Sequence, residues 1–237
     1  MAVGVERTIH WRGGWARLRP WRGRPEVAEI AIGAAAGPSR EVVDECVDRL
    51  RASGYHTVVT TALSPAEALG FVDAGFGVRE RLHLLSHDLS HDLRDPLVAS
   101  GVTRRARRGD RPDVLALDQL SFDAFWRLDD RGLEDALHAT PSVRFRLVDD
   151  GVGIAGYAIT GRAARQGYLQ RLAIHPRARG LGYARTLIAD ALAWLRRRGA
   201  TRALVNTQER NAGALALYEA CGFRRLPTSL CVLGREI

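Results

Sequence analysis

Alternating apolar and polar residues predict strands at residues 26–33 and 168–174. After each strand, apolar residues recur at helical spacing. The apolar stripe of the second stretch consists of Leu187, Ile188, Ala191, Leu192 and Leu195. The stripe of the first stretch consists of Val42, Val43, Cys46, Val47 and Leu50. Gly199 and Gly54 follow these stripes and end the two predicted helices, so the chain predicts two copies of one strand–helix unit.

The two copies also match further along the chain. Residues 57–61 and 203–207 are typical of short buried strands, and each is followed by a helix that ends in a Gly-Phe pair. Final strands are predicted near residues 81–89 and 230–235. This alternation of strands and helices predicts an α/β (α+β) fold.

The copies differ between the strand and the helix. The distance from Ile174 to Gly199 is 25 positions, whereas the distance from Ile32 to Gly54 is 22, and the shorter connection has no clustered glycines. We therefore interpret residues 1–100 as a degenerate, structural half-unit and residues 101–237 as the complete unit. The stretch 95–101, which contains a proline and a glycine, is the expected boundary.

Composition is that of an ordinary globular protein, with 46% hydrophobic and 26% charged residues. No stretch approaches the roughly 20 apolar residues of a membrane helix, and the start of the chain lacks the apolar segment of a signal peptide. We expect a cytoplasmic protein without membrane association. Cys46, Cys221 and Cys231 have no metal-ligand spacing, which predicts free thiols and no metal.

The charge is unusual because all 35 basic residues are arginine, against 27 acidic residues, for a net charge of +8. The absence of lysine excludes regulation by acetylation of the protein's own lysines. Nucleic-acid binding is not favoured, since such proteins concentrate charge with aromatic residues on one face. The cluster 104–111 could attract an acidic partner, although a solvated face is the simpler interpretation.

The segment 172–187 carries the most specific chemistry. Gly180 and Gly182 allow the backbone to turn tightly and to approach a ligand closely, because glycine has no side chain. Exposed amides at the start of the following helix, with the positive end of its dipole, would form an anion site suited to a diphosphate. Arginines at 177, 179 and 185 add positive charge. The alternative is that the two glycines only shape a turn.

This segment resembles the acyl-CoA signature of the GNAT superfamily of N-acetyltransferases, which reads Gln or Arg, two residues, Gly, one residue, Gly or Ala. The residues that fit it, at two overlapping registers of small residues, are Arg179, Gly180, Leu181, Gly182, Tyr183 and Ala184. The resemblance covers residues 102–237 well and the first 100 residues only as a partial copy. It implies a GNAT fold, with a mixed central sheet flanked by helices, and acetyl-CoA as the acyl donor.

Asn211, Leu215 and Tyr218 are spaced to share one helix face. The resemblance implies that Asn211 contacts acetyl-CoA and that Tyr218 lies beside its sulfur, where the phenol would protonate the departing thiolate. It also implies that the strand residues Leu172, Ala173 and Ile174 present backbone groups to the pantetheine arm. The alternative for Tyr218 is a core residue. The first copy has Ser64 and Phe71 at the two equivalent positions, and neither substitutes chemically.

The resemblance implies N-acetyl transfer to a primary amine, of a small molecule or a protein N-terminus, by direct attack in a ternary complex. The candidates for a general base are Asp129, Asp130, Glu134 and His138, each more simply explained as a surface or capping residue. Phe122, Phe125 and Trp126 could line the acceptor pocket, but as an aromatic helix stripe they are more simply core. A non-catalytic acyl-CoA-binding regulator and an enzyme that acetylates charged tRNA stay open as alternatives, as does a homodimer.

Overall fold

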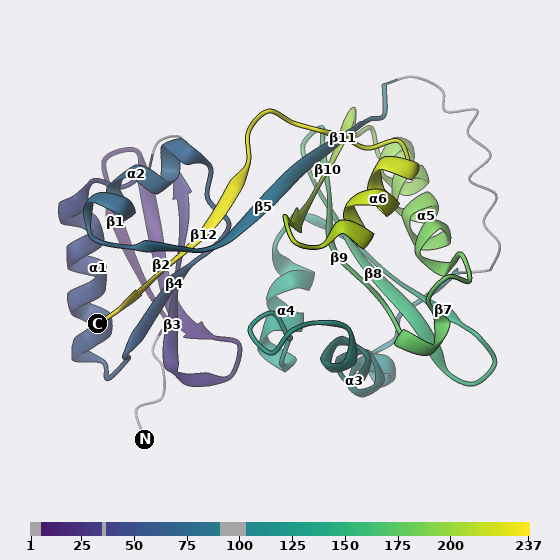
Figure 1. Cartoon of the computed structure of the whole chain (residues 1–237), viewed down its shortest axis with the longest axis horizontal. Helices are drawn as coiled ribbons and strands as arrows, with labels where there is room; N and C mark the ends of the chain where they lie inside the picture. The colour runs from purple at the N-terminus through teal and green to yellow at the C-terminus, as the bar shows by residue number, and fades with distance from the viewer. Residues whose placement is uncertain (1–5, 35–36, 91–102) are drawn as a thin grey trace. The chain divides into compact units, whose positions relative to one another are not determined.

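The computed structural model describes residues 6–34, 37–90 and 103–237 (Figure 1). These residues form two compact units, and neither unit is continuous in sequence. The first unit consists of the described residues of Met1–Leu84, Asn206–Asn211 and Leu226–Ile237, and the second of those of Leu85–Val205 and Ala212–Arg225. The expected boundary at 95–101 lies outside the described residues. The division into residues 1–100 and 101–237 stays a prediction.

The first unit is a mixed sheet with two helices. Its strands lie in the order β1 (Arg7–Trp11), β2 (Gly14–Trp21), β3 (Arg24–Ala34), β4 (Thr57–Thr60), β12 (Leu230–Glu236) and the beginning of β5 (Gly77–Asp88). Its helices are α1 (Arg40–Ala52) and α2 (Pro65–Asp73). The chain therefore brings its last strand, β12, into the unit that its first strands begin.

The strand–helix copy of this unit has the expected form, because β3 and β4 are parallel and α1 connects them. The buried residues of α1 are Val43, Cys46, Val47 and Leu50, which is the predicted stripe without its first member. Ser64 caps α2 by accepting a hydrogen bond from the Glu67 amide, and Phe71 is fully buried. Both residues that replace the polar pair of the second copy thus have structural roles.

The second unit contains the rest of the strands and helices. Its strands lie in the order β6 (Thr103–Arg105), β7 (Ser142–Asp149), β8 (Ile154–Ala163), β9 (Gln166–Ile174), β10 (Arg202–Gln208, as far as Val205) and the end of β5, on which β11 (Arg224–Arg225) pairs. Its helices are α3 (Arg111–Ser121), α4 (Asp130–His138), α5 (Tyr183–Arg197) and α6 (Ala212–Ala220), with short 3-10 turns at Arg108–Asp110 and Pro176–Ala178. Strands β9 and β10 are parallel and α5 connects them, which repeats the arrangement of β3, α1 and β4.

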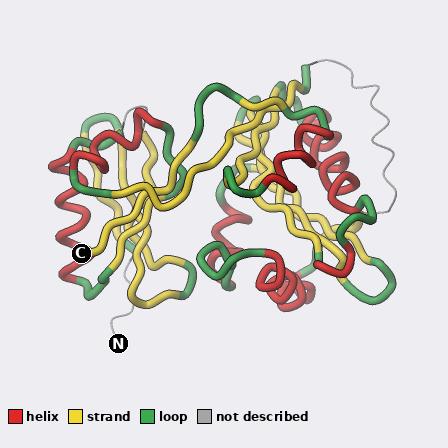
Figure 2. Tube along the Cα trace, in the orientation of Figure 1, coloured by secondary structure: helices red, strands yellow, loops and turns green. Residues whose placement is uncertain are grey.

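Helices cover both faces of this second sheet (Figure 2). On one face α5 buries the predicted stripe, including Leu187, Ile188 and Leu195, in a cluster that Tyr218 joins. On the other face Val114 and Leu117 of α3 form a second cluster with α4. The mixed sheet flanked by helices confirms the predicted fold class. Among the described residues, no helix is both long and apolar enough to cross a bilayer.

Two parts of the structure differ from the sequence prediction. The arginine- and tryptophan-rich start forms the antiparallel pair β1 and β2, which the sequence analysis did not anticipate. The proposed aromatic helix stripe, Phe122, Phe125 and Trp126, is wrong, because α3 ends at Ser121 and Phe122 has extended backbone. The helix stops there because the segment after Ser121 turns back toward α3. The Leu128 amide at the end of this segment donates a hydrogen bond to the buried carboxylate of Asp118.

Candidate functional site

Strand β9 has one incompletely paired edge. It pairs with β8 from Gln166 to Ile174, but its parallel pairing with β10 covers only the three positions from Gln166 to Tyr168. From Leu169 onward, the edge of β9 opposite β8 pairs with no strand among the described residues. A ligand with an extended, amide-containing arm could use the backbone groups of this edge.

The alternation of hydrogen bonds between β8 and β9 identifies the backbone groups that face this open edge. The His175 amide donates to the Ala155 carbonyl at 2.8 Å. In an antiparallel pair alternate residues bond to the same neighbour, so Ala173 faces β8 while Leu172 and Ile174 face away from it. The Ile174 carbonyl accepts a hydrogen bond from the Ser121 hydroxyl at 3.3 Å. Leu172 therefore offers both an amide and a carbonyl at this edge.

The connection from β9 to α5 has the geometry that only glycine adopts readily. Gly180 has φ +80° and Gly182 has φ +85°, both in the left-handed region. Gly182 occupies the N-cap position of α5, and the first intrahelical bond runs from the Thr186 amide to the Gly182 carbonyl at 3.1 Å. Helix geometry thus leaves the amides that precede Thr186 without intrahelical acceptors, where an anion can bind them.

The arginines around this loop have different partners. Arg177 pairs with Asp150 at 3.2 Å, and the hydrogen bond from Arg177 is the leading cause of a lowered pKa of the Asp150 carboxyl. Arg179 and Arg185 are exposed and form no ion pair with any described residue. The uncompensated positive charge at the start of α5 therefore comes from these two residues. His175 is a turn residue, whose Nδ1 accepts from the Arg177 amide at 3.2 Å.

Tyr218 lies in the α5-side cluster and is only 7% exposed. Its ring packs against that of Phe223, with the ring centroids 5.8 Å apart. Burial is the main reason that the pKa of the Tyr218 phenol is raised, and the positive charge of Arg171 opposes this shift. The hydroxyl makes no hydrogen bond within the described part of the chain, which is uncommon for a buried tyrosine. The Tyr218 hydroxyl is thus a protonated donor without an acceptor among the described residues.

Asn211 directly precedes α6, which begins at Ala212, and is exposed. Its amide donates to the Gln208 carbonyl at 2.9 Å. Because α6 begins at Ala212, the predicted face shared by Asn211, Leu215 and Tyr218 begins one residue before the helix itself.

A buried ionic network holds β9 on its other face. Arg171 donates to both carboxylate oxygens of the fully buried Asp118 at 2.9 Å and to the Trp126 carbonyl at 2.7 Å. The Tyr157 hydroxyl donates to the same carboxylate, and burial raises the pKa of that phenol. The network therefore ties α3, the chain after it and β8 to the strand with the open edge.

The sequence analysis missed Asp118, Arg171 and Tyr157. An available signal was the position of Asp118, since it follows Leu117 in a helix stripe that is otherwise apolar. A charged residue at a buried helix position requires a partner, but the spacing alone does not identify Arg171, which is 53 residues away.

The proposed general bases have structural partners in this structure. The Asp129 carboxylate caps α4 by accepting from the Gly132 amide at 2.7 Å, and Asp130 lies in the first turn of that helix. Glu134 pairs with Arg111 at 2.6 Å and lies 3.4 Å from the His138 ring. Within the described residues, no three His, Cys, Asp or Glu side chains are grouped so that they could hold a metal ion.

Comparison with known proteins matches residues 112–223 to the model of the acetyltransferase (GNAT) family. A mycothiol acetyltransferase of Rhodococcus jostii (strain RHA1) is 27% identical, over 92% of this chain and 77% of that protein. The mycothiol acetyltransferase of Salinispora arenicola (strain CNS-205) is 33% identical, over 68% of this chain and 57% of that protein.

Solved structures show the same fold. A tandem GNAT protein from the clavulanic acid biosynthesis pathway superposes with a TM-score of 0.69 at 18% identity, over 94% of this chain and 79% of that one. A GCN5-related N-acetyltransferase from Kribbella flavida superposes with a TM-score of 0.65 at 14% identity, over 97% of this chain and 89% of that one. The tandem neighbour supports the interpretation of the chain as two related copies.

Removal of the buried carboxylate should destabilise the second unit. We expect Asp118→Ala to lower the free energy of unfolding by about 3–5 kcal/mol, because it leaves the Arg171 charge buried without its partner. Asp113→Ala on the exposed face of the same helix should cost at most about 1 kcal/mol. Urea denaturation of both variants measures the difference, and equal losses would show that the network is not the main support of β9.

Proposed function

Since residues 112–223 make this chain a member of the GNAT family of acetyltransferases, we propose that it transfers an acetyl group from acetyl-CoA to a primary amine. The acceptor is an amine of a small molecule or a protein N-terminus. The observation that carries the proposal is the junction of β9 and α5, where an open strand edge leads directly to helix amides exposed by Gly180 and Gly182.

In the proposed complex the two parts of acetyl-CoA use different parts of this junction. The diphosphate binds the loop and the helix start, formed by Arg179, Gly180, Leu181, Gly182, Tyr183 and Ala184. The pantetheine arm lies along Leu172, Ala173 and Ile174, with the amide and carbonyl of Leu172 and the amide of Ile174 as its hydrogen-bond partners. Asn211 supplies a further polar contact to acetyl-CoA.

The transfer itself requires few protein groups. The nitrogen lone pair of the neutral amine attacks the thioester carbonyl carbon, the C–N bond forms, and the tetrahedral intermediate then breaks its C–S bond. The nitrogen loses a proton to water, and the leaving thiolate receives a proton. Most of the rate enhancement comes from positioning the two substrates.

We propose that Tyr218 donates the proton that the departing sulfur receives. Burial keeps its phenol protonated at neutral and alkaline pH, since the pKa is raised, and the hydroxyl has no acceptor among the described residues. A thiolate formed beside it would be that acceptor. Tyr218 would therefore act as the general acid of the second step.

Acetyl transfer is tested by product formation. We expect incubation with acetyl-CoA and pools of primary amines to release CoA thiol and to add the mass of one acetyl group to an acceptor. The names of the relatives make a mycothiol-related amine the first acceptor to test, followed by peptides with free N-termini and amino acids. Saturable acetyl-CoA binding with no thiol release from any pool would instead favour a non-catalytic acyl-CoA-binding regulator.

Acetyl-CoA binding should depend on Gly180 in particular. An alanine Cβ there meets nothing within 4 Å in the free protein, so the cost to folding is the left-handed backbone, about 1–2 kcal/mol. Gly199→Ala is the matched control, because Gly199 has φ +77° and equally open surroundings at the far end of α5.

We expect both variants to lose similar stability but only Gly180→Ala to bind acetyl-CoA about tenfold more weakly, a difference of ~1.4 kcal/mol. Thermal unfolding measures both quantities, since a ligand at 100 times its Kd stabilises by about 2.7 kcal/mol. Calorimetry should give one acetyl-CoA per chain. Equal affinities in the two variants, or two sites per chain, would contradict the proposed site.

Tyr218→Phe should lower kcat by about 10²-fold or more and leave acetyl-CoA affinity unchanged. Because the hydroxyl has no hydrogen bond in the described residues, its loss should cost less than about 1 kcal/mol of stability. Tyr157→Phe is the contrasting control, since it removes the bond to Asp118 and should cost about 1–3 kcal/mol. A Tyr218→Phe variant with wild-type turnover at every pH would exclude the acid role.

A further inference from the structure

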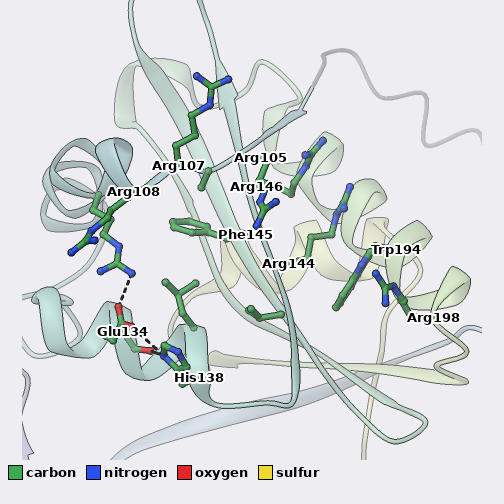
Figure 3. Close-up of a pocket in the computed structure, with 14 residues that line it drawn as sticks. Arg105, Arg107, Arg108, Glu134, His138, Arg144, Phe145, Arg146, Trp194 and Arg198 are labelled. Atoms are coloured by element: carbon green, nitrogen blue, oxygen red, sulfur yellow. Dashed lines mark hydrogen bonds and ion pairs between the residues drawn. The ribbon is translucent and has the colours of Figure 1, made fainter.

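A cleft with an unusual number of arginines lies at the β6–β7 edge of the second unit, apart from the proposed acetyl-CoA site (Figure 3). Its volume is about 840 Å³, which is within the range of ligand pockets. The arginines that line it are Arg105, Arg107, Arg108, Arg111, Arg144, Arg146 and Arg198. Among the described residues that line the cleft, Glu134 is the only one with a carboxylate.

Three of these arginines have their charge compensated. Arg111 pairs with Glu134 at 2.6 Å, and Arg144 pairs with Asp190 at 2.7 Å. Arg146 lies 3.7 Å from the same Asp190 carboxylate. Burial opposes ionisation of Asp190, but the hydrogen bonds from Arg144 and the charges of Arg144 and Arg146 outweigh it and lower the pKa of this carboxyl. A single carboxylate thus serves two guanidinium groups.

The charge of Arg107 lies near the carboxylate of Asp110 and helps to lower the pKa of that carboxyl. The three other arginines have no such partner. Arg105, Arg108 and Arg198 are exposed and form no ion pair with any residue that the structure describes. They come from three separate elements, namely β6, the 3-10 turn before α3, and the residue that ends α5. Because these elements converge on one cleft, the fold brings together positive charges that repel each other. A bound anion would relieve the repulsion between these charges.

The remaining walls of the cleft are partly apolar. Phe145 and Val143 of β7 and Trp194 of α5 line it, and Val143 is 39% exposed. Apolar side chains therefore border the guanidinium groups in this cleft. The aromatic edges can contact the apolar part of a ligand.

We propose that this cleft binds a ligand that carries several phosphate groups. Guanidinium groups donate two parallel hydrogen bonds to phosphate oxygens, and a ligand with several phosphate groups carries several negative charges close together. Three uncompensated positive charges in one cleft therefore match a ligand with several phosphate groups better than they match a ligand with separate carboxylates. The cluster 104–111, for which sequence alone favoured a solvated face, thereby acquires a binding role.

The source of the phosphates is either an RNA strand or a free polyphosphate, and two probes distinguish them. A fluorescent RNA decanucleotide and inorganic tripolyphosphate are each titrated into the full chain, by polarisation and calorimetry respectively. We expect Arg105→Ala/Arg108→Ala/Arg198→Ala to weaken binding of the preferred probe roughly tenfold or more. For RNA, the slope of log K against log salt should also become shallower by about 2.

The control variant removes three exposed arginines of the same unit from outside the cleft, Arg165→Ala/Arg197→Ala/Arg224→Ala, with the same change in charge. A second control, Arg179→Ala/Arg185→Ala, removes the arginines beside the proposed diphosphate loop. With saturating CoA present to fill the diphosphate loop, both controls should bind the probe within about twofold of wild type, which separates this cleft from the general positive charge and from the acetyl-CoA site.

Three outcomes would overturn the proposal. The first is no binding of either probe at low salt. The second is an equal loss of binding in the cleft variant and in either control. The third is binding of a phosphate-free poly-glutamate peptide as tight as that of both phosphate probes, which would assign the cleft to an acidic protein segment. Tighter binding of RNA or of tripolyphosphate supports the proposal and identifies the source.

Discussion

The parallel pairing between β9 and β10 stops after three positions, and the candidate site depends on that early stop. The backbone amides and carbonyls of a central strand are normally hydrogen-bonded to its two neighbouring strands. Here Leu172 and Ile174 keep groups on one edge, while β8 and the Asp118–Arg171 pair hold the strand in place from its other edge and one face. An edge left open in this way is useful only if it is rigid, and the buried network gives it that rigidity.

The two copies of the strand–helix unit show how little separates a scaffold from a candidate site. Both have parallel strands connected by a helix, yet only the second copy has paired left-handed glycines at the start of its helix. At the later helix, Phe71 fills the core where Tyr218 adds a hydroxyl without a described partner. The packing is satisfied in both copies, so the extra hydroxyl is explained by chemistry more readily than by stability.

Periodicity and glycine chemistry predicted the parts of the structure that depend on neighbours in sequence. The stripe of α5, the end of that helix at Gly199 and the turn at Gly180 and Gly182 are all local properties. The rest depended on distant partners. Arg171 finds Asp118 across 53 residues, and the last strand, β12, joins β4 of the first unit. The aromatic segment after Ser121 was misjudged because the chain leaves the helix there, and the Asp118 carboxylate, which Arg171 holds, accepts a hydrogen bond from the Leu128 amide.

The start and the end of α5 both present arginines, but they attract anions by different physics. At the start, Arg179 and Arg185 add to oriented amides and to the positive end of the helix dipole. At the end, Arg198 adjoins the negative end of the same dipole, so any anion there is held by side-chain charges alone. Attraction in the cleft therefore depends on exposed side-chain charges, which salt screens, whereas the loop at the start also holds a diphosphate by hydrogen bonds from backbone amides in a fixed geometry.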